Sequence, residues 1–185
     1  MTASKFLIPL TELEEETYLK FNELDAAELK LKSDVVKKFK QINAKVKINN
    51  SAIGIGADFE VYFVADLICA RCLDTFSRDF KVNLYFNYVK GKDPYTNVEK
   101  VKLAASDADN IYYTGSRIDL SIGIREAIVL SVPIALLCKD NCRGLCPVCG
   151  KNKNKEKCDC KTEKVGLFTP IPKKKKGKAK RVKKK

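Results

Sequence analysis

The sequence contains no histidine among its 185 residues. For any zinc site, that absence leaves ligation by cysteine alone. The sequence also lacks a run of about 20 apolar residues, which excludes a transmembrane α-helix of ordinary length. The opening "MTASKFLIPLTELEEE" has no long apolar run or small-residue cleavage site, and its acidic cluster is not typical of an organelle presequence. We therefore expect a cytoplasmic protein in a reducing compartment, with no membrane association and no small-molecule substrate.

Net positive charge is absent from most of the chain and concentrated at its C-terminal end. The formal net charge is +13, yet residues 1–137 carry 18 Lys/Arg against 19 Asp/Glu. Residues 138–172 carry 8 against 4, and residues 173–185 carry ten basic residues and no acid. This asymmetry indicates a polyanionic partner that approaches from one side. The low-complexity basic tail, residues 163–185, is expected to be disordered on its own.

Three segments alternate apolar and polar residues with a period of two, which predicts β-strands. They are "INAKVKINN" from residue 42, "ADFEVYFVADLIC" from residue 57 and "FKVNLYFNYV" from residue 80. Alternation places one apolar set of each segment on a single face. These sets are Ile42, Ala44, Val46 and Ile48; Phe59, Val61, Phe63, Ala65 and Leu67; and Phe80, Val82, Leu84, Phe86 and Tyr88.

One segment has the apolar spacing of an α-helix, "IDLSIGIREAIVLSVPI" over residues 118–134. Asp119 or Ser121 is suited to cap a helix near 120–131, and Pro133 should end it near Ser131. A second helix over residues 25–40 and a long loop over 91–110 are also expected. The fold class is then α+β: a β-rich domain over residues 1–137, with an antiparallel sheet or partly closed barrel. Its helix leads into a cysteine-rich zinc knuckle over residues 138–162.

Eight cysteines fall in two places in the sequence. They are Cys69 and Cys72 in "CARC", then Cys138, Cys142, Cys146, Cys149, Cys158 and Cys160. Disulfides fit poorly because thiols stay reduced in the cytosol. A redox C-x-x-C motif would need a helix after "CARC", whereas "LDTFSRDFKVNLYF" is typical of a turn and a strand. We therefore predict a protein that is not an enzyme.

Zinc binding explains both the number and the spacing of the thiols. Zn²⁺ takes four ligands in a tetrahedron, and two cysteines two or three residues apart can reach one ion from a tight turn. Eight cysteines predict one or two structural ions, although a cluster of iron and sulfide also accepts four cysteines. Two partitions remain open. Either Cys146, Cys149, Cys158 and Cys160 form one site and Cys69, Cys72, Cys138 and Cys142 the other, or the pairs 69/72 and 158/160 join and leave 138, 142, 146 and 149.

Three blocks resemble the YceD family of bacterial and plastid proteins, named for large ribosomal RNA subunit accumulation. The blocks are "CARCLDTF" at 69–76, "IDLSIGIREAIVLSVPI" at 118–134 and "CKDNCRGLCPVCGKNKNKEKCDC" at 138–160. With the flanking strands, the resemblance covers roughly residues 1–160. It implies a non-enzymatic role in the synthesis, processing or accumulation of 23S ribosomal RNA, with that RNA or the pre-ribosomal large subunit as partner. The alternative is a zinc-ribbon-type module that binds a ribosomal protein or a transcription partner.

Basic residues around the cysteines and in the tail are the candidates for RNA contact. They are Arg71, Arg143, Lys151, Lys153, Lys155, Lys157, Lys173, Lys174, Lys175, Lys176, Lys178, Lys180, Arg181, Lys183, Lys184 and Lys185. Arg71 and Arg143 are equally suited to offset the charge of about −2 on a four-thiolate zinc centre. Strand aromatics at 62, 63, 85, 86 and 88 could stack on bases, but half of any strand faces the core, so core packing is expected for most.

Overall fold

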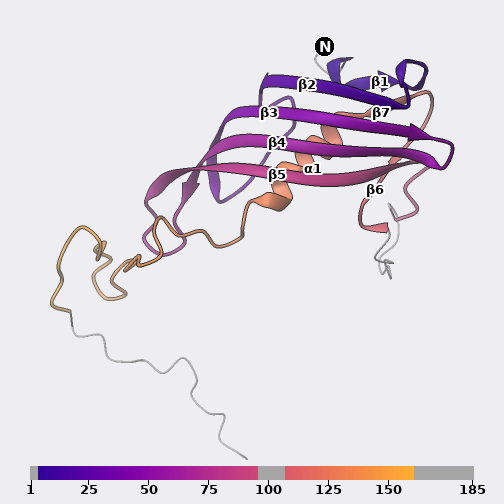
Figure 1. Ribbon diagram of the computed structural model, residues 1–185. Coiled ribbons are helices and arrows are strands. Elements are labelled where there is room, and N and C mark those ends of the chain that lie inside the picture. Colours follow the sequence, from indigo (N-terminus) through magenta and orange to yellow (C-terminus); the bar gives the residue numbers. More distant parts are fainter. Residues whose placement is uncertain (1–3, 96–106, 161–185) are drawn as a thin grey trace, which may run out of the picture.

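A five-stranded β-sheet forms the body of the protein in the computed structural model, which describes residues 4–95 and 107–160 (Figure 1). The spatial order is β2-β3-β4-β5-β6, with β2 to β5 antiparallel and β6 parallel to β5. The strands are β2 (Glu16–Leu24), β3 (Val36–Ser51), β4 (Gly54–Ile68), β5 (Thr75–Lys90) and β6 (Asn110–Tyr113). The predicted sheet is thus confirmed as antiparallel over four strands, and β6 makes it mixed. Among the described strands it stays open, since β2 and β6 are edges.

The core lies between one face of this sheet and a second layer, which is built from residues near the N-terminus and from residues 117–131. That layer contains the single described α-helix, α1 (Leu120–Ser131), and a two-stranded sheet of β1 (Leu7–Pro9) and β7 (Arg117–Asp119) (Figure 1). Short 3₁₀ turns, Ser4–Phe6 and Leu10–Glu12, flank β1. The apolar sets predicted for the three long strands face this core, where Phe59, Val61 and Phe63 are almost fully buried.

Helix α1 forms where the sequence predicted it, because its local signals and its packing agree. Asp119 is the N-cap, and its carboxylate accepts a hydrogen bond from the Ser121 backbone N–H at 2.9 Å. The helix ends at Ser131, two residues before Pro133. Gly123 lets the helix approach the sheet, since a Cβ there would lie 2.4 Å from the Phe59 ring. No described helix is long and apolar enough for a membrane crossing.

The helix expected over residues 25–40 is wrong. Residues 26–30 form turns that bury Leu29, and β3 begins at Val36. Val36 pairs with Leu67 and Phe39 with Ala65, so pairing along β4 overrides a locally helix-compatible composition. β2 was not predicted either, because its charged residues occupy the outer face of an edge strand and hide the alternation. Of the loop expected over 91–110, residues 96–106 lie outside the described residues.

Candidate metal centres

The "CARC" stretch forms the tight turn between β4 and β5 at one end of the sheet. The Cys69 backbone N–H donates to the Asp74 carbonyl at 2.9 Å, and the Leu73 N–H donates to the Cys69 carbonyl at 3.0 Å. Leu73 adopts a φ of +59°, which reverses the chain within these few residues. The turn therefore holds Cys69 and Cys72 close together at the end of a rigid hairpin.

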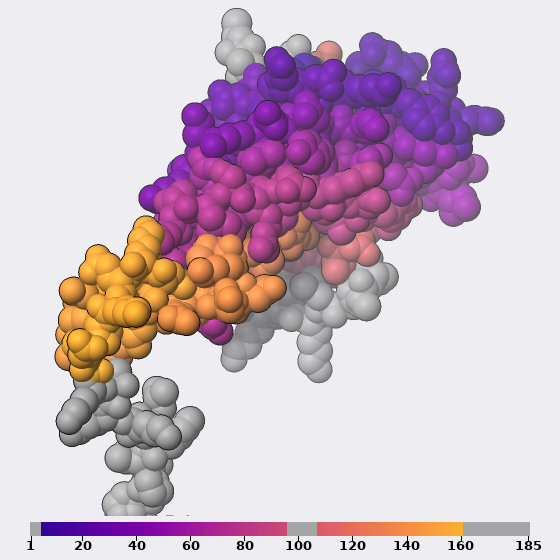
Figure 2. Space-filling model, turned by 60° about the vertical axis from the view of Figure 1, so that its left-hand side comes forward, coloured from indigo at the N-terminus to yellow at the C-terminus, as the bar shows by residue number. Residues whose placement is uncertain are grey.

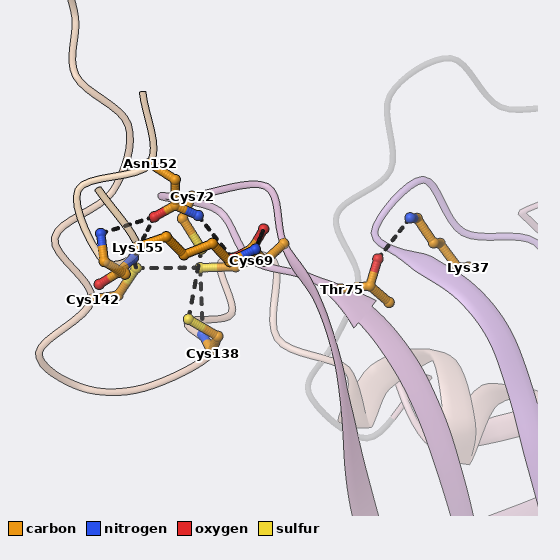
Figure 3. A network of polar contacts seen from close by, with 10 residues as sticks. Lys37, Cys69, Cys72, Thr75, Cys138, Cys142, Asn152 and Lys155 are labelled. Atoms are coloured by element: carbon orange, nitrogen blue, oxygen red, sulfur yellow. Dashed lines mark hydrogen bonds and ion pairs between the residues drawn. The ribbon is translucent and has the colours of Figure 1, made fainter. Parts of the chain in front are cut away.

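The segment after α1 brings two more cysteines to this turn. The Ala70 N–H donates to the Leu136 carbonyl at 2.8 Å, which aligns the incoming chain beside "CARC". Cys69 Sγ then lies 3.8 Å from Cys142 Sγ, and Cys72 Sγ lies 3.7 Å from Cys138 Sγ (Figure 3). All four sulfur atoms lie within 4.8 Å of one another, and all but that of Cys138 belong to buried residues. We call Cys69, Cys72, Cys138 and Cys142 the inner cysteine group.

The spacing of the inner group fits a metal ion. Four ligands at about 2.3 Å from a tetrahedrally coordinated Zn²⁺ lie about 3.8 Å apart, which matches the two Sγ–Sγ distances above. A disulfide would need about 2.05 Å. N–H groups point at two sulfurs, as expected for thiolates: Cys138 N lies 3.4 Å from Cys69 Sγ, and Asn154 Nδ2 lies 3.3 Å from Cys142 Sγ. The donor set and its surroundings therefore suit a four-thiolate zinc site.

The remaining four cysteines, Cys146, Cys149, Cys158 and Cys160, form the outer cysteine group. Their sulfurs also lie within 4.8 Å of one another, but only Cys146 is buried and Cys149 is exposed. A turn positions the first pair: the Gly150 N–H donates to the Cys146 carbonyl at 2.9 Å, and Gly150 adopts a φ of +72°. The cysteines thus assemble in the first of the two predicted partitions.

Each group combines a thiol that ionises readily with thiols that do not. Burial raises the pKa of Cys69, but backbone N–H groups of Cys138, Cys72 and Arg71 outweigh it and lower the pKa to about 6. The Asp74 N–H lowers the pKa of Cys72, yet burial and the other three thiols raise it to about 12.

In the outer group, the N–H groups of Cys149 and Val148 lower the pKa of Cys146 to about 6. Contact with Cys149, then burial, raises the pKa of Cys160 to about 11. A metal ion bound by four thiolates must therefore displace protons from either group.

Two asparagines that the sequence analysis did not single out connect the segment between the outer cysteines to the "CARC" turn and to the inner group. Asn152 Nδ2 donates to Asp74 Oδ2 at 2.8 Å, and Asn154 Oδ1 accepts from the Arg143 N–H at 2.9 Å. Asn152 also forms a β-bridge with Leu145, whose N–H donates to the Arg71 carbonyl at 3.0 Å. The available signal was "NKN" at 152–154, one residue after "CPVCG", which places two short amide side chains beside the turn that holds Cys146 and Cys149.

Three of the cations predicted to contact RNA have partners within the protein. Lys155 pairs with Asp74 at 2.9 Å (Figure 3), Lys151 pairs with Glu156 at 3.4 Å, and Arg71 donates to the Cys142 carbonyl at 3.1 Å. These contacts lie within the cysteine-rich segment or join it to the "CARC" turn.

Three other predicted cations line one hollow of about 650 Å³ that reaches the end of the outer group. They are Arg143, Lys153 and Lys157. Glu156 and Asp159 line the same hollow, but within the described residues neither forms an ion pair with any of these three cations. The predicted tail residues, Lys173 to Lys185, lie outside the described part of the chain.

Comparison with known proteins supports the family resemblance found in the sequence. The profile of the family "Large ribosomal RNA subunit accumulation protein YceD" matches residues 57–171, so β2 and β3 lie outside the match. Two chloroplastic relatives named "Large ribosomal RNA subunit accumulation protein YCED homolog 1" are 45% identical in Arabidopsis thaliana and 40% identical in Zea mays, each over 55 residues. Those stretches span 29% of this chain and 17% and 19% of the relatives, less than a fifth of their length. No solved structure gives a significant match. The chain belongs to the YceD family of large ribosomal RNA subunit accumulation proteins.

Proposed function

We propose that this protein is a zinc-stabilised, non-enzymatic factor that binds RNA of the large ribosomal subunit during its synthesis or processing. The observation that carries the proposal is the hollow lined by Arg143, Lys153 and Lys157 beside the outer four-cysteine group, in a chain of this family. The family name supports a role in large-subunit RNA accumulation. The residues around the cysteines support direct contact with that RNA.

The two cysteine groups support a structural rather than a catalytic metal. A catalytic zinc keeps an open position beside three protein ligands, whereas each group here offers four thiols to one ion. Sulfurs 3.7–3.8 Å apart leave room for a single ion and little for a cluster of several iron and sulfide atoms. Zinc in the inner group would join the β4–β5 turn to the segment after α1. The free thiols also favour a reducing compartment, and we propose the cytoplasm.

The charges around the outer group suit a polyanion. Each four-thiolate zinc centre carries about −2, and paired cations such as Lys155 and Lys151 offset local negative charge. The three cations of the hollow are available to phosphates, and each phosphate contact releases counterions from RNA. The hollow ends at Cys160, where the described chain ends and leads towards the ten basic residues of 173–185. The hollow and the tail would together supply salt-sensitive affinity for RNA.

A protein-binding role is the second candidate, and a specific observation favours it. Val148, in the turn between two outer cysteines, is 65% exposed, and Leu73, in the "CARC" turn, is 61% exposed. Apolar side chains presented at the tips of metal-stabilised turns are suited to a partner's pocket. In that case, replacing the three cations would leave binding intact, and replacing Val148 and Leu73 by Ser would abolish it.

Crosslinking and sequencing of RNA bound in cells tests the proposal. The full chain is compared with a version that ends at Pro172 and with a triple Gln variant of the hollow at Arg143, Lys153 and Lys157. The matched control is a triple Gln variant at three exposed lysines elsewhere, Lys32, Lys90 and Lys92.

We expect the full chain, the shortened chain and the control to recover the same region of large-subunit RNA, and the hollow variant to recover much less. In vitro, loss of three phosphate contacts lowers the salt slope by about 2, at about 0.7 per contact on single strands. Scattered RNA bound by the full chain and none by the shortened chain would contradict recognition by the folded domain.

A further inference from the structure

The second face of the sheet, which packs against no described element, carries exposed aromatic side chains. Helix α1 lies on the opposite face (Figure 1), and the cysteine-rich segment projects from the end of the sheet (Figure 2). On the outer face of strands β2 to β5, Tyr18 is 66% exposed, Tyr85 46% and Tyr62 39%. Of the strand aromatics considered as base-stacking candidates, the structure buries Phe63, Phe86 and Tyr88 and leaves Tyr62 and Tyr85 on the surface.

Two of these tyrosines are held flat along their own strands. The Tyr18 hydroxyl donates to Glu16 Oε2 at 2.9 Å, and the Tyr85 hydroxyl donates to Asn87 Oδ1 at 2.9 Å. Residues two apart on a strand share a face, so each bond draws the ring parallel to the strand. Gly56 provides the space for one ring, because a Cβ there would lie 2.2 Å from the Tyr85 hydroxyl oxygen. Both rings are therefore fixed in place at the surface of the sheet.

A hollow of about 530 Å³ crosses the four strands at the level of these tyrosines. Two rows of side chains border it, each contributing one residue from every strand. The rows are Tyr18, Lys47, Asp58 and Tyr85, and Lys20, Lys45, Glu60 and Asn83. The floor is strand backbone, because the residues between the rows turn their side chains inward. Tyr18 and Tyr85 stand three strand spacings apart, about 14 Å, so one ligand can contact both rings only if it is extended.

The chemistry of the hollow suits nucleobases and phosphates together. Every base has a π face that stacks on an aromatic ring regardless of sequence. Three lysines and two carboxylates line the hollow, although Lys47 pairs with Glu16 at 2.7 Å and Lys45 with Glu60 at 3.9 Å. Lys20 forms no ion pair within the described residues, and Lys47 Nζ also lies 5.6 Å from the centre of the Tyr18 ring. Asp58, Glu60 and Asn83 can accept hydrogen bonds from exocyclic amino groups at base edges. A purely electrostatic RNA site would lack these acceptors, and a site for a folded duplex would lack the exposed rings.

We propose that the outer face of strands β2 to β5 binds single-stranded RNA, with separate bases of one strand stacked on Tyr18 and Tyr85. This inference rests on the proposed function and adds a second contact surface to it. The hollow beside the outer cysteine group and the basic tail supply sequence-independent affinity. The sheet face adds to the affinity for RNA a contribution that depends on the presence of bases.

Binding of the full, zinc-loaded chain to two fluorescent probes tests the inference. One probe is an unstructured 12-nucleotide RNA, and the other is an abasic ribose-phosphate oligomer of the same length and charge. We expect the wild-type chain to bind the base-bearing probe at least about 10-fold more tightly, from about 1–3 kcal/mol per stacked base. The double variant Tyr18→Ala/Tyr85→Ala should bind both probes equally. The matched control Tyr18→Phe/Tyr85→Phe keeps the rings and should keep the preference.

Equal affinity of the wild-type chain for both probes, or a double Ala variant that keeps the wild-type preference, would overturn the inference. A measurement on the wild-type chain alone guards against a variant that does not fold. Because the chain has seven tyrosines and no tryptophan, stacking should quench tyrosine emission with the base-bearing probe and not with the abasic one. Unchanged emission at saturation overturns the inference as well.

Crosslinking in cells separates this inference from the proposed function. A wild-type chain that recovers no large-subunit RNA contradicts the proposed function. A wild-type chain and a double Ala variant that recover the same RNA in equal amounts contradict the sheet-face inference alone. A double variant that loses the discrete region while the double Phe variant retains it supports both.

Discussion

Zinc binding to this protein should depend steeply on pH, and the structure sets the slope. In the inner group, Cys69 is largely ionised at pH 7 because its pKa is lowered to about 6, whereas the pKa values of Cys72 and Cys138 are raised and both retain protons. Four-thiolate ligation must expel at least these two protons. The apparent affinity should therefore rise about 100-fold per pH unit around pH 7, with one decade for each proton released.

The direction of this pH dependence follows from the direction of each pKa shift. Because the pKa of Cys69 is below that of an unfolded thiol, the stabilisation from its thiolate is present at pH values above the unfolded pKa and is lost as the pH falls through about 6. Acid therefore weakens the metal-free fold and zinc binding together, and below pH 6 a third proton competes with the metal. Raising the pH from 6.5 to 7.5 strengthens binding.

Competition with a chelator of known affinity at pH 6.5, 7.0 and 7.5 measures this slope. Calorimetry in two buffers with different ionisation enthalpies counts the released protons independently. Both methods should give about two or more protons per zinc ion. The matched control is Cys149→Ser, which removes a ligand of the outer group and should leave one pH-dependent ion in the inner group. A slope of less than one decade per pH unit would refute the reasoning, since it would mean that the inner thiols are already ionised or do not bind the metal.

Three further substitutions test other parts of the molecule. Gly123→Ala should destabilise the fold by about 1–3 kcal/mol, because its methyl would collide with Phe59; an unchanged denaturation midpoint would contradict this close approach. Asp119→Ala removes the α1 cap and should cost about 0.5–2 kcal/mol in urea unfolding, with Asp119→Asn as the conservative control. Asn154→Ala removes the N–H···S contact with Cys142 and should accelerate zinc loss to a chelator about 10-fold or more. If its rate matches that of the wild type, Asn154 does not support the metal site.

The sequence predicted the parts of the fold that depend on neighbours within a few residues. Alternation identified the three long strands, and the local cap and Pro133 fixed the ends of α1. The prediction from sequence failed where pairing between distant segments decides the structure. Val36 joins a strand because Leu67 lies beside it, and the parallel contact of β6 has no local signature. Asn152 was missed for the same reason, since its partner Asp74 is 78 residues away. Alternation implies that Tyr62 and Tyr85 face away from the core, but it could not show that Gly56 makes room for the Tyr85 ring.

The inner cysteine group also determines when its metal site can form during synthesis of the chain. Its two close sulfur–sulfur contacts join residues that are 66 and 73 positions apart. A bound ion therefore closes a long chain loop and restricts the unfolded ensemble as a disulfide would, which stabilises the fold by about 4 kcal/mol. Because synthesis runs from the N-terminus, the β4–β5 hairpin can form before Cys138 exists. At about 5–20 residues per second, several seconds pass before the second pair of ligands emerges. During that interval Cys69 and Cys72 lack the other two ligands, so metal closure of the inner group follows formation of the hairpin.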